Sequence, residues 1–573
     1  MAAVSQNCLL FFSGVIQNGD ELECEIGRCE TGPRIVVRAW ERWGWDLARM
    51  LRGAYALVLV DPASKRGLCT RDPMGTHPLF WSGAGPSRIF SPSIDALRRH
   101  PKVSSGINRV AAVNHLRDSW PDPSETFFAE IHRLPPGYRM CLENGRWRTE
   151  RYWLTEDGAE MPQDTDLDRF EPLFERAVRR STRGVRPAIF LSGGLDSVAV
   201  AGVASDLARD ARAAGPHTLS LGFPGDESDV NEQAIQSGVA RRLALSQDLL
   251  PFADAAGPGG LLAAAIELSP TLGSPLLNTW LPAYSRLAGL GAARGHDVIL
   301  TGTGGDEWLG VSPLLAADFL AAGRFRDLLA LARFNARSFR NPKGSMLGAL
   351  LWTFGLRPVL RARAVGWLDG HAPSWMSARR QKRIEGSLGA WLAPDPSLRA
   401  EAIRRIEQSD HAADQRGGSH YVGQMRTALD SAVVSWEFEE MWDHYGRLGV
   451  RMAHPFCDPD LIEFLYRIDP AVLVQSRRTK GPLRAMLESR FPDLGFSAQR
   501  KVDGVHFLRR LFRAELPGVW RRLGGIQALV ELGVVCAGDF EKHWNRNLES
   551  ATLRQLHRMW SVLNFEAWIR PRR

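Results

Sequence analysis

The spacing of apolar and polar positions changes near residue 165. Before this point, short apolar runs alternate with Pro/Gly turns, which is typical of strands and hairpins. The clearest strand is expected over 54–60, with 67–70 as its hairpin partner. Residues 1–150 are therefore predicted to form mainly short strands, and the polar stretch 161–168 is predicted to be a linker.

Beyond the linker, apolar runs of strand length alternate with stretches of helical spacing. Strands are expected over 188–191, 217–223 and 297–301, and helices over 167–180, 198–214 and 230–243. This alternation predicts an α/β fold with a doubly wound parallel sheet covered on both faces. From Pro313 onward the pattern is mostly helical.

Composition restricts the class of protein. The chain has 573 residues, of which 44% are hydrophobic and 24% charged, as in globular proteins of two or three domains. No run approaches the ~20 apolar residues of a membrane span, and the start lacks a basic signal-peptide region. We therefore expect a cytoplasmic protein without a membrane span. Seven cysteines without a C-x-x-C pair indicate reduced thiols.

The net charge of +8 is concentrated in one region. Between Arg324 and Arg383, basic residues greatly outnumber the two acids Asp327 and Asp369. Such a patch is compatible with nucleic acid, an acidic peptide, a partner protein or a solvated helical face. We expect no nucleic acid among the partners, and the other interpretations stay open.

The stretch IFLSGGLDSV places a glycine loop between a predicted strand and a predicted helix. Backbone N–H groups of Gly193 and Gly194, at the helix start, form an anion cradle, and Ser192 and Ser197 add hydroxyl donors. Asp196 would repel a phosphate unless a cation lies between them, and Mg²⁺ is the simplest such cation. The loop differs from both the G-x-x-x-x-G-K-[ST] and the G-x-G-x-x-G pattern.

A second predicted strand is also followed by a glycine-rich loop and an aspartate. In VILTGTGGDE, residues 298–307, the strand is followed by Gly302, Thr303 and Gly304 and then by Asp306. Adjacent parallel strands bring their carboxyl ends to one edge of the sheet. Asp196 and Asp306 are therefore predicted to lie close together at this edge.

These motifs resemble those of the asparagine synthetase family. The loop 192–197 is similar to the S-G-G-x-D-S loop of ATP pyrophosphatases, 454–458 to the family's P-F-L-D segment, and 479–484 to its K-x-x-L-R segment. The resemblance implies ATP and Mg²⁺ as cofactors, with Asp196 and Asp306 sharing the magnesium ion and Lys480 acting on the acyl-adenylate. Arg500 and Lys501 resemble a further basic segment of the family. The implied ATP contacts are Leu191, Ser192, Gly193, Gly194, Asp196, Ser197, Leu221, Gly222, Phe223, Gly302, Thr303 and Gly304.

The segments 52–56, 71–80 and 90–97 resemble the glutaminase domain of the same family. The resemblance implies an Ntn-like α+β sandwich, so we expect a degenerate glutaminase-like domain over 1–160. The ligase domain is expected over 161–573, with the ATP site in 188–312 and a mostly helical part in 313–573. A working glutaminase of this class has a cysteine after the initiator methionine, where this chain has Ala2. Because the nitrogen of Cys8 is tied up as an amide, it cannot replace that residue.

Without ammonia from glutamine, the attacking amine is expected to come from the substrate itself. Two branches of the family work this way, the β-lactam synthetases and the lasso peptide cyclases. Thr303 stands where a β-lactam synthetase has a tyrosine, whereas the chain length, the Arg- and Trp-rich helical region and the form RMAHPFCD are more similar to a lasso cyclase.

A lasso cyclase adenylates an Asp or Glu side chain of a precursor core peptide and closes a macrolactam with the peptide's N-terminal amine. The resemblance implies a ribosomal precursor peptide, a leader peptidase and a leader-recognition protein as partners. The alternatives are an asparagine synthetase-like or β-lactam synthetase-like ligase with a small substrate, and a non-catalytic scaffold.

The general base is sought among Glu437, Glu439, Glu440 and His444. Glu437 and Glu440 are three residues apart and can share one helix face, so they join Lys480 as catalytic candidates. The alternative interpretation of this pair is a solvated helix edge.

Overall fold

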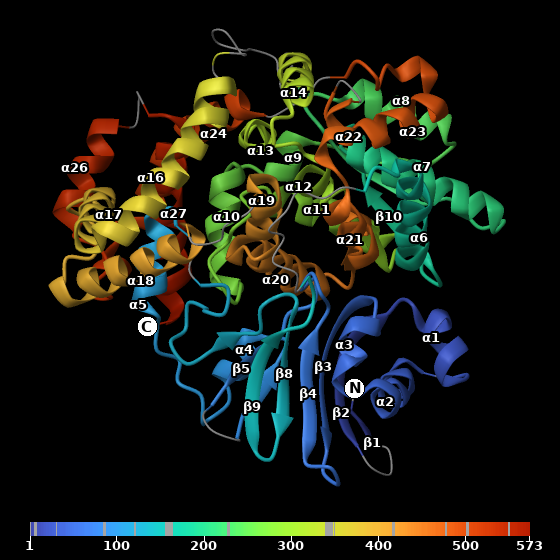
Figure 1. The fold of residues 1–573 in the computed structure, drawn as a ribbon, viewed down its shortest axis with the longest axis horizontal. Helices are drawn as coiled ribbons and strands as arrows, with labels where there is room; N and C mark the ends of the chain where they lie inside the picture. The colour runs from blue at the N-terminus through green and yellow to red at the C-terminus, as the bar shows by residue number, and fades with distance from the viewer. Residues whose placement is uncertain are drawn as a thin grey trace.

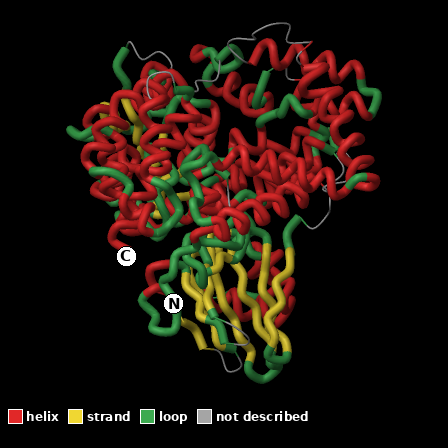
Figure 2. Tube along the Cα trace, turned by 90° about the vertical axis from the view of Figure 1, so that its left-hand side faces the viewer, coloured by secondary structure: helices red, strands yellow, loops and turns green. Residues whose placement is uncertain are grey.

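The protein is described from a computed structural model, and the described residues are 2–4, 8–29, 31–83, 87–119, 122–154, 164–225, 230–338, 348, 350–414, 419–475, 478–499, 504–547 and 551–572. The N-terminal strands lie at one end, beneath a much larger helical part (Figure 1). A quarter turn shows the same division, with the N-terminal strands gathered below the helices (Figure 2).

The N-terminal part contains two antiparallel sheets. The larger sheet has the order β1-β2-β3-β4-β8-β9 and the smaller one β6-β5-β7. The predicted hairpin is confirmed, with Val58 of β3 opposite Cys69 of β4. The strands are β1 Ala2–Val4, β2 Leu9–Ile16, β3 Gly53–Asp61, β4 Arg66–Arg71, β5 Phe80–Ser82, β6 Ile89–Ser91, β7 His132–Arg133, β8 Tyr138–Glu143 and β9 Arg146–Arg151.

Alternate residues of β3 serve two separate cores, as the two-residue period of a strand requires. Leu57 and Leu59 pack with helix α2 (Gly32–Trp43), whose Val36 and Trp40 are buried. Their neighbour Val58 faces the opposite core, which contains Leu79 beside the smaller sheet. This layered arrangement agrees with the expected α+β sandwich.

The second sheet is entirely parallel, with the order β12-β11-β10-β13-β14. The three predicted strands are confirmed as β10 Pro187–Phe190, β11 His217–Gly222 and β13 Val298–Leu300. Two more, β12 Gln247–Pro251 and β14 Arg451–Ala453, were not predicted. Both are edge strands; β12 is only half-buried and β14 has three residues, so neither produces a long apolar run.

Helices cover both faces of this sheet. The predicted helices are confirmed as α6 Phe170–Thr182, α7 Leu195–Asp210 and α8 Gln233–Arg242. The remaining ones before residue 313 are α1 Gly19–Ile26, α3 Leu47–Met50, α4 Ile94–Arg98, α5 Arg109–Leu116, α9 Phe252–Ala256, α10 Leu261–Leu268, α11 Leu281–Ala293 and α12 Gly305–Leu309, with the 3₁₀ turns η1 Gly44–Asp46, η2 Leu167–Arg169 and η3 Ser269–Thr271.

The prediction of a mostly helical region after residue 313 is also confirmed. It contains α13 Leu315–Ala321, α14 Phe325–Ser338, the π-helical η4 Leu350–Leu356, α16 Arg357–His371, α17 Pro373–Leu388, α18 Pro396–Asp414, α19 His420–Leu429, α20 Ala432–Arg447, η5 Pro455–Cys457, α21 Pro459–Arg467, α22 Pro470–Gln475, α23 Gly481–Arg490, η6 Pro492–Leu494, α24 Val505–Leu523, α25 Gln527–Glu531, α26 Ala537–Asn547, α27 Leu553–Ile569 and η7 Arg570–Arg572. None of these described helices is both long and apolar enough to cross a bilayer.

Several predictions concern residues that lie next to, or outside, the described ranges. In the proposed linker, 161–163 lie outside the described residues, and Asp164 forms an isolated bridge with Ile468. Arg500 and Lys501 also lie outside them. The boundary at residue 160 stays a prediction; α5, which precedes it, packs against α18 and α27 of the helical part.

Strand order determines where a site can form. β10 lies in the middle of the parallel sheet, with β11 on one side and β13 on the other. Crossovers in opposite directions leave a crevice at the carboxyl ends of the strands. The loops after β10 and β13 therefore begin side by side, as predicted.

Candidate active site

Hydrogen bonds of its own serine hydroxyls hold the loop after β10 in its conformation. The Ser197 hydroxyl accepts from the backbone N–H of Ser192 (3.1 Å) and donates to the carbonyl of Gly194 (3.1 Å). The Ser192 hydroxyl accepts from the N–H of Gly194 (3.2 Å). Gly193 has φ +83°, and a Cβ there would stand 2.8 Å from the Cβ of Glu232. The loop therefore needs glycine both for its conformation and for the close approach of Glu232.

The glycines after β13 have a role that the sequence did not indicate. A Cβ on Gly302 would lie 2.8 Å from the Cβ of Asp196 and 2.9 Å from the backbone nitrogen of Ser197. A Cβ on Gly305 would overlap the carboxyl group of Asp196. These glycines allow the two loops to pack directly against each other, which brings Asp196 and Asp306 together.

Lys480 lies between the two predicted metal-binding carboxylates. Its Nζ contacts Asp196 Oδ2 and is 2.6 Å from Asp306 Oδ1. Lys480 immediately precedes α23 and has the left-handed φ of +61°, which is uncommon for a side-chain-bearing residue. Arg484 supports this conformation, because its backbone N–H donates to the Lys480 carbonyl (3.0 Å) and its Nε to the Thr479 carbonyl (2.7 Å).

Burial and charge act against each other in this cluster. Burial raises the pKa of Asp196 to about 6 although the Lys480 ammonium lowers it. Burial also opposes the charge on Lys480, but Asp196 and Asp306 raise its pKa overall. Two carboxylates and an ammonium thus form a compact charged group at the edge of the sheet.

The donor set fits a magnesium ion that is completed by phosphate. Asp196 Oδ1 is buried and has no hydrogen-bond partner. Among the described residues no group of three or more His, Cys, Asp or Glu side chains could hold a metal. Mg²⁺ is commonly held by only one or two carboxylates together with phosphate oxygens and water. Asp196 and Asp306 satisfy that requirement.

The charged group opens into a cavity of about 700 Å³. Ser192, Gly194 and Asp196 line it on the side of the glycine loop, and residues of α19 also line it. A neighbouring cavity of about 230 Å³ is lined by Leu191, Leu221 and Phe223 among others. Ser192 and Glu232 line both cavities, which places the glycine loop between the wide chamber and the smaller cavity.

Most of the predicted ATP contacts are brought to this place. Leu191, Leu221 and Phe223 line the small cavity, and Gly222 packs beside Leu249. Thr303 is directed toward the supporting structure instead: its N–H donates to Thr301 Oγ1 (3.2 Å), and its carbonyl accepts from the Cys457 thiol (3.7 Å).

Glu232 and Gln499 are site residues that sequence reasoning missed. Burial raises the pKa of Glu232 to about 7. The Gln499 amide donates to the Gly193 carbonyl (3.1 Å) and to Glu232 Oε1 (3.4 Å). Gln499 is far from the loop in sequence, and Glu232 precedes α8 without a distinctive motif. Only the tertiary packing of both residues on the loop marks them.

The segment 454–458 supports the loop after β13. His454 Nδ1 is 2.7 Å from Thr301 Oγ1, and Phe456 stacks on Phe174 with ring centroids 4.5 Å apart. Asp458 pairs with Arg180 at 2.9 Å and so points away from the cavity. This motif positions the catalytic loop rather than contributing a group to it.

The four candidates for a general base on α20 have different surroundings. Glu439 is buried in an ion pair with Arg133, and the ring of His444 contacts the Ser285 hydroxyl. Glu440 accepts the backbone N–H groups of Leu277 (2.5 Å) and Asn278 (3.0 Å). All three side chains thus have structural partners.

Glu437 and Glu440 are coupled, as expected for one helix face. Burial raises the pKa of Glu440 to about 8, and the charge of Glu437 adds to this. Burial raises the pKa of Glu437 to about 7, and Glu307 adds to it. Glu437 therefore interacts electrostatically with Glu307, which lines the main cavity. The assignment of either glutamate as the base stays a prediction.

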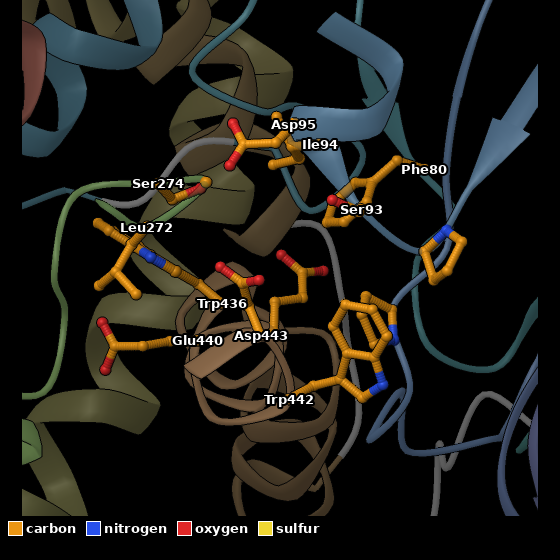
Figure 3. Close-up of a pocket in the computed structure, with 14 residues that line it drawn as sticks. Phe80, Ser93, Ile94, Asp95, Leu272, Ser274, Trp436, Glu440, Trp442 and Asp443 are labelled. Carbon is orange, nitrogen blue, oxygen red and sulfur yellow. The ribbon is translucent and has the colours of Figure 1, made fainter. Parts of the chain in front are cut away.

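Glu440 faces a different cavity, between the N-terminal sheets and α20. This space of about 30 Å³ is lined by Phe80 and Ile94 from the N-terminal part and by Trp442 and Asp443 from α20 (Figure 3). Its size suits about one water molecule. Glu440 is therefore separated from the chamber that contains Lys480.

The fold and site define an α/β protein that binds phosphate groups where its strand order reverses. Residues 169–570 match the asparagine synthase family, and residues 1–153 match a glutamine amidotransferase domain. The chain belongs to the asparagine synthase family.

Relatives with assigned names include both synthetases and amidases. A putative glutamine-hydrolyzing asparagine synthetase of Mycobacterium bovis is 24% identical over 98% of this chain and 84% of its own length. The amidase chyE of Penicillium rubens is 28% identical, with 50% of this chain and 44% of the amidase covered. Asparagine synthetase 3 of Bacillus subtilis is 23% identical, with 40% and 38% covered. The chain spans less than half the length of the amidase and of the Bacillus synthetase.

Proposed function

We propose that the protein is an ATP-dependent, AMP-forming ligase that closes an amide bond within one peptide substrate, as a lasso peptide cyclase does. The observation that carries the ligase proposal is the group formed by Asp196, Asp306 and Lys480 beside the glycine loop. Its place in an asparagine synthase domain supports ATP as the activating substrate.

In the proposed first step, an oxygen of the substrate carboxylate attacks the α-phosphorus of ATP, and pyrophosphate leaves. The N-terminus of α7, at the end of the loop, attracts the phosphate oxygens, and Asp196 with Asp306 would hold Mg²⁺. When bound, this ion neutralises phosphate charge. The Lys480 ammonium donates hydrogen bonds to the charge that develops on the transferred group.

In the second step, the substrate's amine nitrogen attacks the acyl carbon, and AMP leaves with the electrons of the broken C–O bond. A base must take one proton from the amine, and Glu437 is our candidate. Because one molecule supplies both groups, holding them in contact contributes on the order of 7–11 kcal/mol at best. The surrounding protein therefore acts mainly by positioning the amine against the acyl carbon.

Three of the five cysteines among residues 1–153 are unsuited to act as a glutaminase nucleophile, whereas Cys24 is exposed and Cys29 half-buried. Cys8 is buried among apolar side chains, and burial raises the pKa of its thiol. Cys69 and Cys141 are also buried, with pKa values raised by burial. A nucleophilic cysteine needs access and a lowered pKa. These three thiols have neither.

The size of the chamber supports a substrate larger than an amino acid. It extends from the phosphate loop to Tyr421, Gln424 and Met425 on α19, so one wall comes from the helical region. A volume of about 700 Å³ is in the upper range of small-molecule sites. It leaves room for peptide residues on either side of an activated carboxylate.

The proposal is tested with purified protein, ATP, Mg²⁺ and a linear core peptide that has a free N-terminus and an internal Asp or Glu. We expect AMP, pyrophosphate and a peptide lighter by one water, seen by mass spectrometry. ADP in place of AMP would exclude adenylation. The matched control is the same peptide with its N-terminus acetylated, which should give no ring.

The names of the relatives support one competing function, the synthesis of asparagine. Aspartate with ammonium or glutamine should therefore be tested under the same conditions. Aspartate-dependent AMP release with formation of asparagine would replace the peptide substrate by a small one and leave the ligase chemistry in place.

A further inference from the structure

Three tryptophans of the helical region lie on the outside of the protein. Among the described residues, Trp352, Trp367 and Trp375 are the tryptophans classed as exposed, with 59%, 61% and 49% of their surface accessible. All three fall within one stretch of η4, α16 and α17. A cluster of exposed large apolar side chains marks an interaction site, whereas scattered ones need no explanation.

Two leucines extend the cluster into a stripe. Leu356 and Leu360 are 45% and 51% exposed, and Trp367 follows Leu360 after seven residues. Spacings of four and seven place these side chains on one helix face. Each described side chain of α16 keeps part of its surface accessible, so this helix lies on the protein instead of within it.

The opposite side of this segment is anchored. η4 packs against α13, and Gly355 approaches Leu320 so closely that a Cβ would lie 2.5 Å from Leu320 Cδ1. α13 in turn packs against α19, which forms a wall of the main cavity. The apolar stripe is therefore an exposed face of a segment that is anchored on its other side to the helical part (Figure 1 labels α16 and α17).

Positive charge surrounds the stripe. Residues 350–383 contain seven arginines and lysines, of which Arg380 is buried, and one acid, Asp369. Arg357, Arg361 and Arg363 are exposed on α16 itself. On α17, the Arg379 guanidinium lies 5.1 Å from the centre of the Trp375 ring, a cation–π contact at the surface.

We propose that η4, α16 and the start of α17 form a docking surface for an anionic lipid bilayer. A helix with Trp and Leu on one side and arginine on its flanks inserts its apolar face into the headgroup boundary. Its basic residues are attracted to anionic lipid. The exposed leucines and tryptophans fit an apolar layer, and they offer nothing to a phosphate backbone. This surface does not depend on the reaction proposed above.

Co-sedimentation of the full chain with vesicles tests this surface. One vesicle contains phosphatidylcholine and phosphatidylglycerol in a three-to-one ratio, and the other contains phosphatidylcholine alone. We expect binding to the anionic vesicle, little binding to the neutral one, and a fall in binding as salt is raised. Equal binding to both, or none to either, overturns the proposal.

Two double variants separate the contribution of the positive charges to vesicle binding from that of the apolar side chains. R357E with R361E should weaken binding by at least about 25-fold, since each basic residue near an anionic surface contributes about fivefold. L360Q with W367Q should weaken it by at least about tenfold through the loss of apolar burial. Circular dichroism and thermal melting establish that each variant is folded.

Matched controls lie elsewhere on the surface. R241E with R242E changes two exposed arginines of α8, and F11Q changes an exposed apolar residue of β2 (61% accessible). Both should bind vesicles like the unaltered chain, and equal losses in these controls would contradict a localised surface. Saturable binding of a labelled oligoglutamate or oligonucleotide, without vesicle binding, would assign the surface to an acidic protein or to nucleic acid and overturn the lipid proposal.

Discussion

Arg133 and Glu439 form a two-bond ion pair between the N-terminal sheets and helix α20. Arg133 Nε is 2.6 Å from Glu439 Oε1, and Arg133 Nη2 is 2.9 Å from Oε2. Arg71 joins from β4 at 3.3 Å, and its side chain is completely buried. α20 lies along the top of the N-terminal sheet (Figure 1). The N-terminal part is thereby joined to the helix that carries Glu437.

Glu439→Gln should lower the free energy of unfolding by about 3–5 kcal/mol, because two buried guanidinium groups lose their counter-charge. Urea unfolding followed by circular dichroism measures this. Glu175→Gln is the matched control: it breaks an exposed pair with Arg179 and should change stability by less than about 0.5 kcal/mol. Equal effects of the two changes would contradict the role of the buried pair.

Asp196→Asn should reduce substrate-dependent pyrophosphate release by at least about 100-fold, because preorganised charge near the phosphates is lost. The thermal melting temperature should fall little. Asp206→Asn, on the same helix α7, is the control, since its carboxylate pairs with Arg490 at 3.1 Å away from the loop. Activity of Asp196→Asn near that of the control would refute the assignment of the phosphate site.

Gly305→Ala should reduce turnover by more than about tenfold, because its Cβ would displace the Asp196 carboxyl group. Gly446→Ala in α20 adds the same methyl group where no atom lies within 4 Å, and it should leave turnover unchanged. Steady-state release of AMP compares the two. Unchanged activity of Gly305→Ala would show that the two loops can separate without cost to the site.

The pH dependence of turnover should reveal Glu437 if it accepts the amine proton. Burial raises its pKa to about 7, so the carboxyl keeps its proton below that pH and cannot act as a base. Turnover should therefore rise with pH through about 7, and Glu437→Gln should remove this limb of the profile.

A second variant checks the cause of that limb. The charge of Glu307 raises the pKa of Glu437, so Glu307→Gln should move the limb to lower pH. Its amide oxygen can still accept from the N–H of Gly304, as Glu307 Oε2 does at 3.0 Å. A limb that persists in Glu437→Gln would assign the base to another residue, with Glu232 the next to test.

Local sequence was sufficient for the elements that have strong periodicity. Strands β10 and β13 are short apolar runs, as is typical of strands covered on both faces, and the buried strand β11 carries Leu219 and Leu221 at alternate positions. β14 could not be found in this way, because its three residues become a strand only by pairing with β13. Glu232 and Gln499 were missed for a similar reason, since neither belongs to a motif.

The sequence by itself determined the central strands of the parallel sheet and the two glycine loops, because each depends on residue type and short-range spacing. The sharing of one magnesium ion by Asp196 and Asp306 stays a prediction. Only the tertiary structure decided that glycines allow the two loops to pack directly against each other, that Lys480 lies between the carboxylates, and that Glu439 and Glu440 have structural partners. These outcomes depend on burial and on partners from distant segments. A carboxylate on a helix becomes a base or a structural acceptor according to what packs against it.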